Sequence, residues 1–270
     1  MNHIFWFTLR RNWLSLAIFG LGIGLFHWLV VVSFPAIGGL DAVQNVVQTF
    51  PPGLRSLLRI APNLQAGFGL VEYLSLTWFH PVFLGLGSAF VVQRATDAIA
   101  GEIESGAIYL TLSRPILRRS VLLGKALEMF FGAGILCFFG WLGLFIGAQM
   151  LPELAMAESL PFGRYGLVAM VAWLLFMALG AAVLVISSLC NRKSVAGGIG
   201  SIWAIGAFLL DVVPFVAKSS VGWLNPWHHY FPQEIMAMGT VEMGSLILLA
   251  GWIVGGVVVA VIIFGRRDLV

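Results

Sequence analysis

The protein has 270 residues, of which 60% are hydrophobic and 10% are charged, and its formal net charge is +3. Soluble domains average about 45–50% apolar and about 25% charged residues, so the composition excludes a soluble globular protein and indicates an integral membrane protein. The small positive charge is not a nucleic-acid signal, because the basic residues gather beside apolar runs, where they report membrane topology.

Six apolar runs are long enough to cross a bilayer, which takes about 20 residues. They predict one all-α transmembrane domain over residues 1–270, with spans at 13–35, 73–92, 121–151, 165–190, 195–216 and 245–264. Residues 1–12 predict an interfacial helix, because their apolar side chains oppose Arg10 and Arg11. A cleaved signal peptide is the rival interpretation, but the following run is longer than a signal sequence needs and has no small-residue cleavage site.

Two long loops, residues 36–71 and 217–244, join spans on the outer side. The first contains "FPPGLRSLLRIAPN", which predicts a short amphipathic helix, and the second is a loop or re-entrant segment. Pro81 lies inside the second span and predicts a kink there. Cys137 and Cys190 lie in apolar segments and are expected to be buried and free.

Basic residues indicate the orientation of the spans. Six spans place both termini on one side, and this side carries Arg10, Arg11, Arg94, Arg114, Arg118, Arg119, Lys125, Arg192, Lys193, Arg266 and Arg267. The opposite flanks hold only Arg55, Arg59, Arg164 and Lys218. Because Lys and Arg concentrate on the cytoplasmic side, we expect both termini in the cytoplasm.

A stretch between the second and third spans is unusually charged. At 100° per residue, an amphipathic surface helix here places Asp97 and Glu104 on one face, with the apolar face formed by Ile99, Ile103, Ala107 and Leu110. Gly106 loosens this helix, and Ser113 is expected to cap the next one, with Pro115 in its first turn. Lys125 and Glu128 are spaced to pair on one helix face.

The same stretch, "GEIESGAIYLTLSRPILRRSVLLGK", resembles the signature of type-2 ABC transporter permeases. The family pattern is Glu-x-Glu-Ser-Gly, then Leu-x-Leu-Ser-x-Pro, an Arg and a closing Leu-Gly-Lys. Ala107 and Ile108 depart from the Thr and Leu that many relatives carry after Ser-Gly. The order of elements along the whole chain is also similar to that family, as is "NPWHHYFP" before the last span, and "FPPGLRSLLRI" resembles multidrug and polyketide-antibiotic exporters.

This resemblance implies that residues 95–113 form a coupling helix that docks on a separate ATPase subunit. The residues expected at that contact are Asp97, Glu102, Glu104, Ser105, Gly106 and Arg114. It further implies two permease chains with two ATPase chains in the inner membrane, exporting a lipid-like, drug or antibiotic cargo between spans two and five. The residues expected along that path are His80, Phe83, Trp203 and Asp211.

The chain itself has no nucleotide-binding loop, since G-x-x-x-x-G-K-[ST] ending at Gly124 and Lys125 would need Gly at 119 and Ser or Thr at 126, where Arg119 and Ala126 stand. We therefore expect no cofactor or metal in this chain, and ATP with Mg²⁺ in the partner.

Two other functional classes stay open. An ion-coupled secondary transporter is the first, because Asp211 lies inside the fifth span and Glu72 at the mouth of the second. Against it, Asp211 lies near the outer end of its span and the sequence shows no inverted repeat. An intramembrane enzyme is less favoured, because there is no HExxH and the neighbouring His228 and His229 suit an interfacial aromatic belt.

Overall fold

The computed structural model describes residues 2–51, 70–151 and 160–268, and in this part of the chain all regular structure is helical. Six helices are long and apolar enough to cross a membrane, which confirms the all-α, six-span prediction. The elements are α1 (Asn2–Ser33), α2 (Gly39–Thr49), α4 (Leu70–Leu76), η2 (Thr77–Phe79), α5 (Pro81–Thr96), η3 (Asp97–Gly101), α6 (Glu102–Glu104), α7 (Ala107–Leu112), α8 (Arg118–Gln149), α10 (Phe162–Leu189), α11 (Lys193–Val212), α12 (Pro214–Ala217), α13 (Ser220–Trp223), η4 (Pro226–His229), α14 (Pro232–Met238) and α15 (Met243–Arg266).

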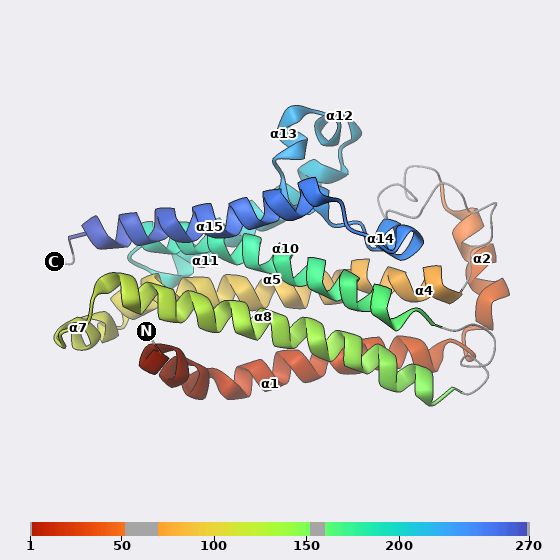
Figure 1. Ribbon diagram of the computed structural model, residues 1–270, viewed down its shortest axis with the longest axis horizontal. Coiled ribbons are helices and arrows are strands. Elements are labelled where there is room, and N and C mark those ends of the chain that lie inside the picture. Colours follow the sequence, from red (N-terminus) through yellow and green to blue (C-terminus); the bar gives the residue numbers. More distant parts are fainter. Residues whose placement is uncertain (1, 52–69, 152–159, 269–270) are drawn as a thin grey trace.

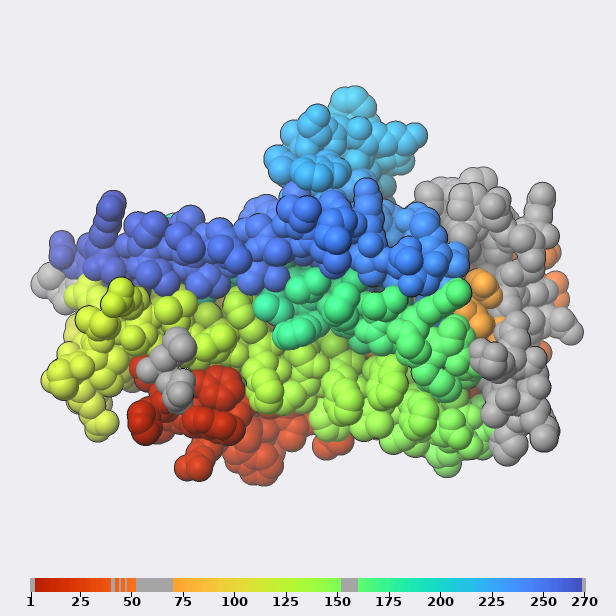
Figure 2. Space-filling view, viewed as in Figure 1, coloured from red at the N-terminus to blue at the C-terminus, as the bar shows by residue number. Residues whose placement is uncertain are grey.

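The long helices run along a common axis (Figure 1). Both termini and α7 lie at one end, which we call the terminal face, and α2, α4 and α14 lie at the opposite end, the far face. Helix α10 packs against α15, α8, α5 and α11, so it forms the centre of the bundle. After α11 the chain leaves the bundle, and α12 and α13 project from its side before η4 (Figures 1 and 2).

The first span differs from the prediction of a separate interfacial helix. Helix α1 is continuous over 32 residues, so residues 1–12 are not a separate element where they are described. At 1.5 Å per residue this helix is about 48 Å long, whereas the hydrocarbon core is about 30 Å thick. The first turns of α1 therefore extend beyond the apolar layer as part of the same helix.

Helix α1 lies against α8 at a very close approach. A Cβ atom added to Gly143 of α8 would clash with the backbone carbonyl of Gly24 in α1. Small residues at such crossings allow helix backbones to meet, which is how helices gain van der Waals contact within a membrane. By contrast, a Cβ on Gly251 or Gly255 of α15 would meet no atom of the described residues within 4 Å, so these two glycines make no such crossing there.

The second span is interrupted rather than kinked. Helix α4 passes into the 3₁₀ turn η2, His80 is extended, and Pro81 then occupies the first turn of α5. This position suits proline because its missing N–H would have no partner there in any case. His80 caps the new helix, since its Nδ1 accepts a hydrogen bond from the Val82 amide at 3.2 Å.

Residues 95–113, which we call the acidic segment, begin as a continuation of this span. Helix α5 runs directly into the π-helical turn η3 and then α6, and Gly106 ends the run with φ of +74°. After this bend, α7 ends at Ser113, whose amide donates to the Tyr109 carbonyl. The expectation that Ser113 caps the third span is wrong, because α8 begins only at Arg118.

The two predicted outer loops are partly described. Residues 217–244 fold as α13, η4 and α14, which follow α12. In the first loop α2 is helical, while the predicted helix in "FPPGLRSLLRIAPN" lies almost entirely outside the described residues.

Candidate functional site

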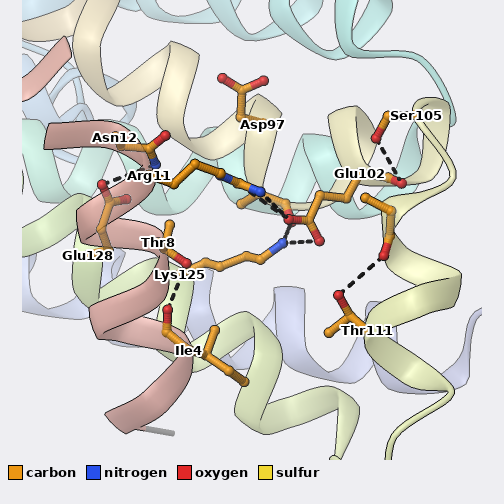
Figure 3. Close-up of polar contacts among 12 residues, drawn as sticks. Ile4, Thr8, Arg11, Asn12, Asp97, Glu102, Ser105, Thr111, Lys125 and Glu128 are labelled. Atoms are coloured by element: carbon orange, nitrogen blue, oxygen red, sulfur yellow. Dashed lines mark hydrogen bonds and ion pairs between the residues drawn. The ribbon is translucent and has the colours of Figure 1, made fainter. Parts of the chain in front are cut away.

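The carboxylate of Glu102 points into the bundle and not to solvent. It forms an ion pair with Nζ of Lys125 from α8 and a longer one, 3.4 Å, with Arg11 from α1. Figure 3 shows both cations converging on this carboxylate. Nζ of Lys125 also donates to the Ala98 carbonyl at 2.7 Å. The acidic segment is thereby bound to two spans at once.

A second charged pair lies next to the first. Glu128 of α8 lies 3.9 Å from Nε of Arg94 and accepts a hydrogen bond from Nδ2 of Asn12 at 3.4 Å. The expected pairing of Lys125 with Glu128 is therefore wrong, because each side chain turns to a different helix. Buried charges of this kind are tolerated only where partners offset their desolvation. Glu102, Lys125, Arg94 and Glu128 are almost fully buried, whereas Arg11 is exposed.

The π-helical turn η3 is held by one serine of α10. Oγ of Ser187 accepts a hydrogen bond from the Ala100 amide at 3.1 Å and donates to the Thr96 carbonyl at 3.3 Å. A π turn disrupts the regular ladder of helix hydrogen bonds, so polar backbone groups there need other partners. Ser187 supplies both of these bonds inside the bundle and ties the acidic segment to α10.

Two other carboxylates of the segment reach the start of α11. Asp97 pairs with Nζ of Lys193 at 2.6 Å, and Oε2 of Glu104 accepts a hydrogen bond from the Lys193 backbone amide at 2.8 Å. Asp97 and Glu104 were predicted to share one helix face, and both do contact the same residue, Lys193. The N-cap residue of α11, Arg192, offers no side-chain hydrogen bond, so Glu104 takes the place of a cap.

Two arginines close the same face around the C-terminus. Arg267 donates to the carbonyls of Ser188 and Cys190, at 2.6 and 3.0 Å, where α10 ends. Arg118, at the start of α8, donates in turn to the Arg267 carbonyl at 2.5 Å. Basic side chains suit the carbonyl end of a helix, so these topology-marking arginines also fasten the turn between α10 and α11.

The exposed part of the acidic segment is its tip. Of the six residues predicted to contact a partner, Glu104, Ser105 and Arg114 are exposed, Gly106 forms the bend, Asp97 is partly covered by Lys193, and Glu102 is buried. Tyr109 and Leu110, which were not predicted at this contact, are also exposed there, with exposed fractions of 46% and 76%. Leu110 was expected on the membrane-facing side together with Ile99, but the left-handed turn at Gly106 changes the helix phase between them.

The four predicted path residues do not form one site. Phe83 is buried against His27, Trp78 and Phe176. Trp203 packs against Trp252 of α15 with ring centroids 5.7 Å apart. None of the four, including His80 and Asp211, lines the cavity that does lie between α5 and α11.

That cavity has a volume of about 330 Å³ and an almost wholly apolar wall. The cavity exists because the two facing helices carry small residues there, namely Gly85, Ser88, Ala89, Ser201 and Ala204. Phe208 and Trp227 close one end. An apolar recess with a few hydroxyl groups is the usual character of a small-molecule site.

The two adjacent histidines, predicted to lie in an interfacial belt, both make polar contacts with side chains of other helices. Nδ1 of His228 lies 3.0 Å from Oδ1 of Asp211, a buried carboxylate near the end of α11. His229 is buried and uses both ring nitrogens, with Ser245 at 2.9 Å and the Trp223 carbonyl at 2.6 Å. Burial lowers the pKa of His229. These contacts join the chain after α11 to both α11 and α15.

Within the ranges that the structure describes, no three His, Cys, Asp or Glu side chains lie close enough together to hold a metal ion. Cys137 and Cys190 are both free cysteines, but only Cys137 is buried as predicted, while Cys190 is partly exposed.

Comparisons with known proteins agree on one family. The family model described as ABC-2 family transporter protein matches residues 10–269, which include the whole acidic segment. The chain is also similar to the probable ABC transporter permease protein NosY of Pseudomonas aeruginosa. The two are 33% identical over 258 residues, covering 93% of this chain and 81% of that relative.

Proposed function

The chain belongs to the ABC-2 family of transporter permeases, and we propose that it exports a hydrophobic or amphipathic molecule with energy from ATP hydrolysed on a separate subunit. As a permease subunit it is a multi-pass membrane protein and not itself an enzyme. The relative named above is called an ABC transporter permease protein, which is consistent with this role.

One observation carries the proposal of an ATPase partner. The acidic segment is locked into the bundle at its root by Glu102, yet its tip is exposed and mixes apolar with charged side chains. Leu110 and Tyr109 offer apolar area, and Glu104 and Arg114 offer charges beside it. Protein interfaces combine an apolar centre with a polar rim in this way. ATP and Mg²⁺ bind to the partner in this proposal, because the chain has no phosphate-binding loop.

The cavity between α5 and α11 supports the proposed cargo. Its apolar wall suits a lipid-like, drug or antibiotic molecule better than a sugar or an ion, because a charged cargo would lose its hydration there without gaining partners. Helices α5 and α11 correspond to the spans that the resemblance placed along the transport path.

In the proposed assembly, two permease chains, identical or different, combine with two ATPase chains. The terminal face lies on the cytoplasmic side of the inner membrane, since most Lys and Arg flank that end of the spans. This orientation points the exposed tip of the acidic segment to the compartment that contains ATP.

Purification of the tagged chain from its own cells tests the partner. We expect a chain with a G-x-x-x-x-G-K-[ST] motif to co-purify, and Leu110→Asp to reduce its recovery strongly. Met243→Asp is the matched control, because Met243 is 68% exposed but lies at the opposite end of a span. Equal recovery with both variants, or no ATPase in the complex of the unaltered chain, would contradict the proposed docking tip.

A further inference from the structure

We propose that Asp97 and Glu104 are positioning residues that carry the movement of the acidic segment to α11; the inference rests on the proposed ATP-driven function. Both carboxylates hold the same residue at the start of α11. Asp97 binds the ammonium group of Lys193 at 2.6 Å, and Glu104 binds its backbone amide at 2.8 Å.

The contact with the backbone amide is directional. A helix N-terminus carries unpaired N–H groups and a partial positive charge, so a carboxylate placed there makes a charge-assisted hydrogen bond. Most helices take this cap from their own preceding residue, but Arg192 supplies none to α11. The cap therefore comes from another element, and a displacement of Glu104 pulls directly on the axis of α11.

Helix α11 also forms one wall of the space in which cargo is proposed to move. Ser201, Ala204 and Phe208 line the apolar cavity between α5 and α11. A second cavity of about 530 Å³ lies nearer the terminal face, between the same helices, and Glu104 and Lys193 are among its lining residues. Because Lys193 and these lining residues belong to one rigid helix, a shift at Lys193 changes the shape of both cavities.

The buried polar anchors of the segment lead to other helices. Glu102 holds α8 and α1, and Ser187 belongs to α10. Among the described polar contacts, those of Asp97 and Glu104 with Lys193 connect the segment to α11, which forms one wall of the cavity. The two glutamates of the Glu-x-Glu pattern thus have different roles, since Glu102 anchors the segment and Glu104 connects it to α11.

A capping rescue separates this role from simple stabilisation of α11. Glu104→Ala removes the cap, and Arg192→Ser then supplies a local N-cap within α11. The test uses vesicles that hold the permease with its ATPase, and a fluorescent single-chain amphiphile as the probe. We expect Glu104→Ala to lower the amount of this probe moved per ATP hydrolysed by roughly fivefold or more, the lower end of typical coupling between linked sites. The double variant should recover its melting temperature but not this ratio.

Recovery of the ratio by Arg192→Ser would overturn the proposal, because Glu104 would then act only as a cap. Glu242→Ala, which removes an exposed carboxylate just before α15, is the control and should leave the ratio unchanged. Failure of the proposed function looks different, since the unaltered complex would then show no ATP-dependent transport at all.

Discussion

Lys125 of α8 binds Glu102 of the acidic segment inside the bundle, where their side chains are 5% and 10% exposed. The pair is reinforced by Arg11 and by the Ala98 carbonyl, so the segment is held at its root by charge as well as by packing. In the proposed function the segment receives force from the ATPase subunit, and this buried ion pair holds its first turns against α8 and α1.

Removal of one member of this pair should destabilise the protein more than removal of both. Lys125→Met leaves the Glu102 carboxylate buried with only Arg11 nearby, and breaking a buried pair typically costs about 3–5 kcal/mol. Glu102→Gln in the same chain removes the uncompensated charge, and Arg11, 44% exposed, is then solvated. Thermal unfolding in detergent should show a large loss for Lys125→Met and substantial recovery in the double variant. A double variant no more stable than Lys125→Met would contradict this account of the pair.

The close crossing of α1 and α8 should not tolerate a larger side chain. Gly143→Val forces α8 away from the Gly24 carbonyl, and overpacking of this kind costs about 1–3 kcal/mol or more. Gly22→Val is the control on the facing helix, since a Cβ there meets nothing within 4 Å. The melting temperature should fall for Gly143→Val and stay close to the original for Gly22→Val. Similar losses in both would mean that helix-interior valine, and not the crossing, is responsible.

His229 should make the protein acid-sensitive. Burial lowers its pKa, so the unfolded chain binds a proton at a pH where the folded chain does not. The free energy of unfolding therefore falls as the pH drops below about 6.5, the ordinary value for histidine, and is unaffected by this group at higher pH. The variant His229→Asn should lose less melting temperature between neutral and acidic buffer than the unaltered chain. His3→Asn, at an exposed histidine, should keep the original dependence, and an unchanged slope in His229→Asn would count against the burial argument.

The parts of the fold that could be predicted are those set by local pattern. Six spans follow from apolar run length, and the shared face of Asp97 and Glu104 follows from their spacing of two helical turns. The interruption at Pro81 also follows from local chemistry, although the structure shows a full break with a new helix rather than a bend.

The parts that could not be predicted depend on contacts between distant residues. Glu102 was placed on the surface because its partners, Lys125 and Arg11, belong to other spans. The local spacing of Lys125 and Glu128 suggested a pair, but inside the bundle each finds a partner from another helix. Leu110 was misplaced for a different reason, since the positive φ at Gly106 resets the helix phase.

Transport by purified components tests the central claim most directly. The permease is reconstituted in vesicles with and without its ATPase, and movement of a fluorescent single-chain amphiphile is measured with ATP and with no ion gradient. We predict export that requires both the ATPase and ATP and that stops when the ATPase lacks its phosphate-binding lysine. Equal transport by the permease alone, driven by an imposed ion gradient, would contradict the account.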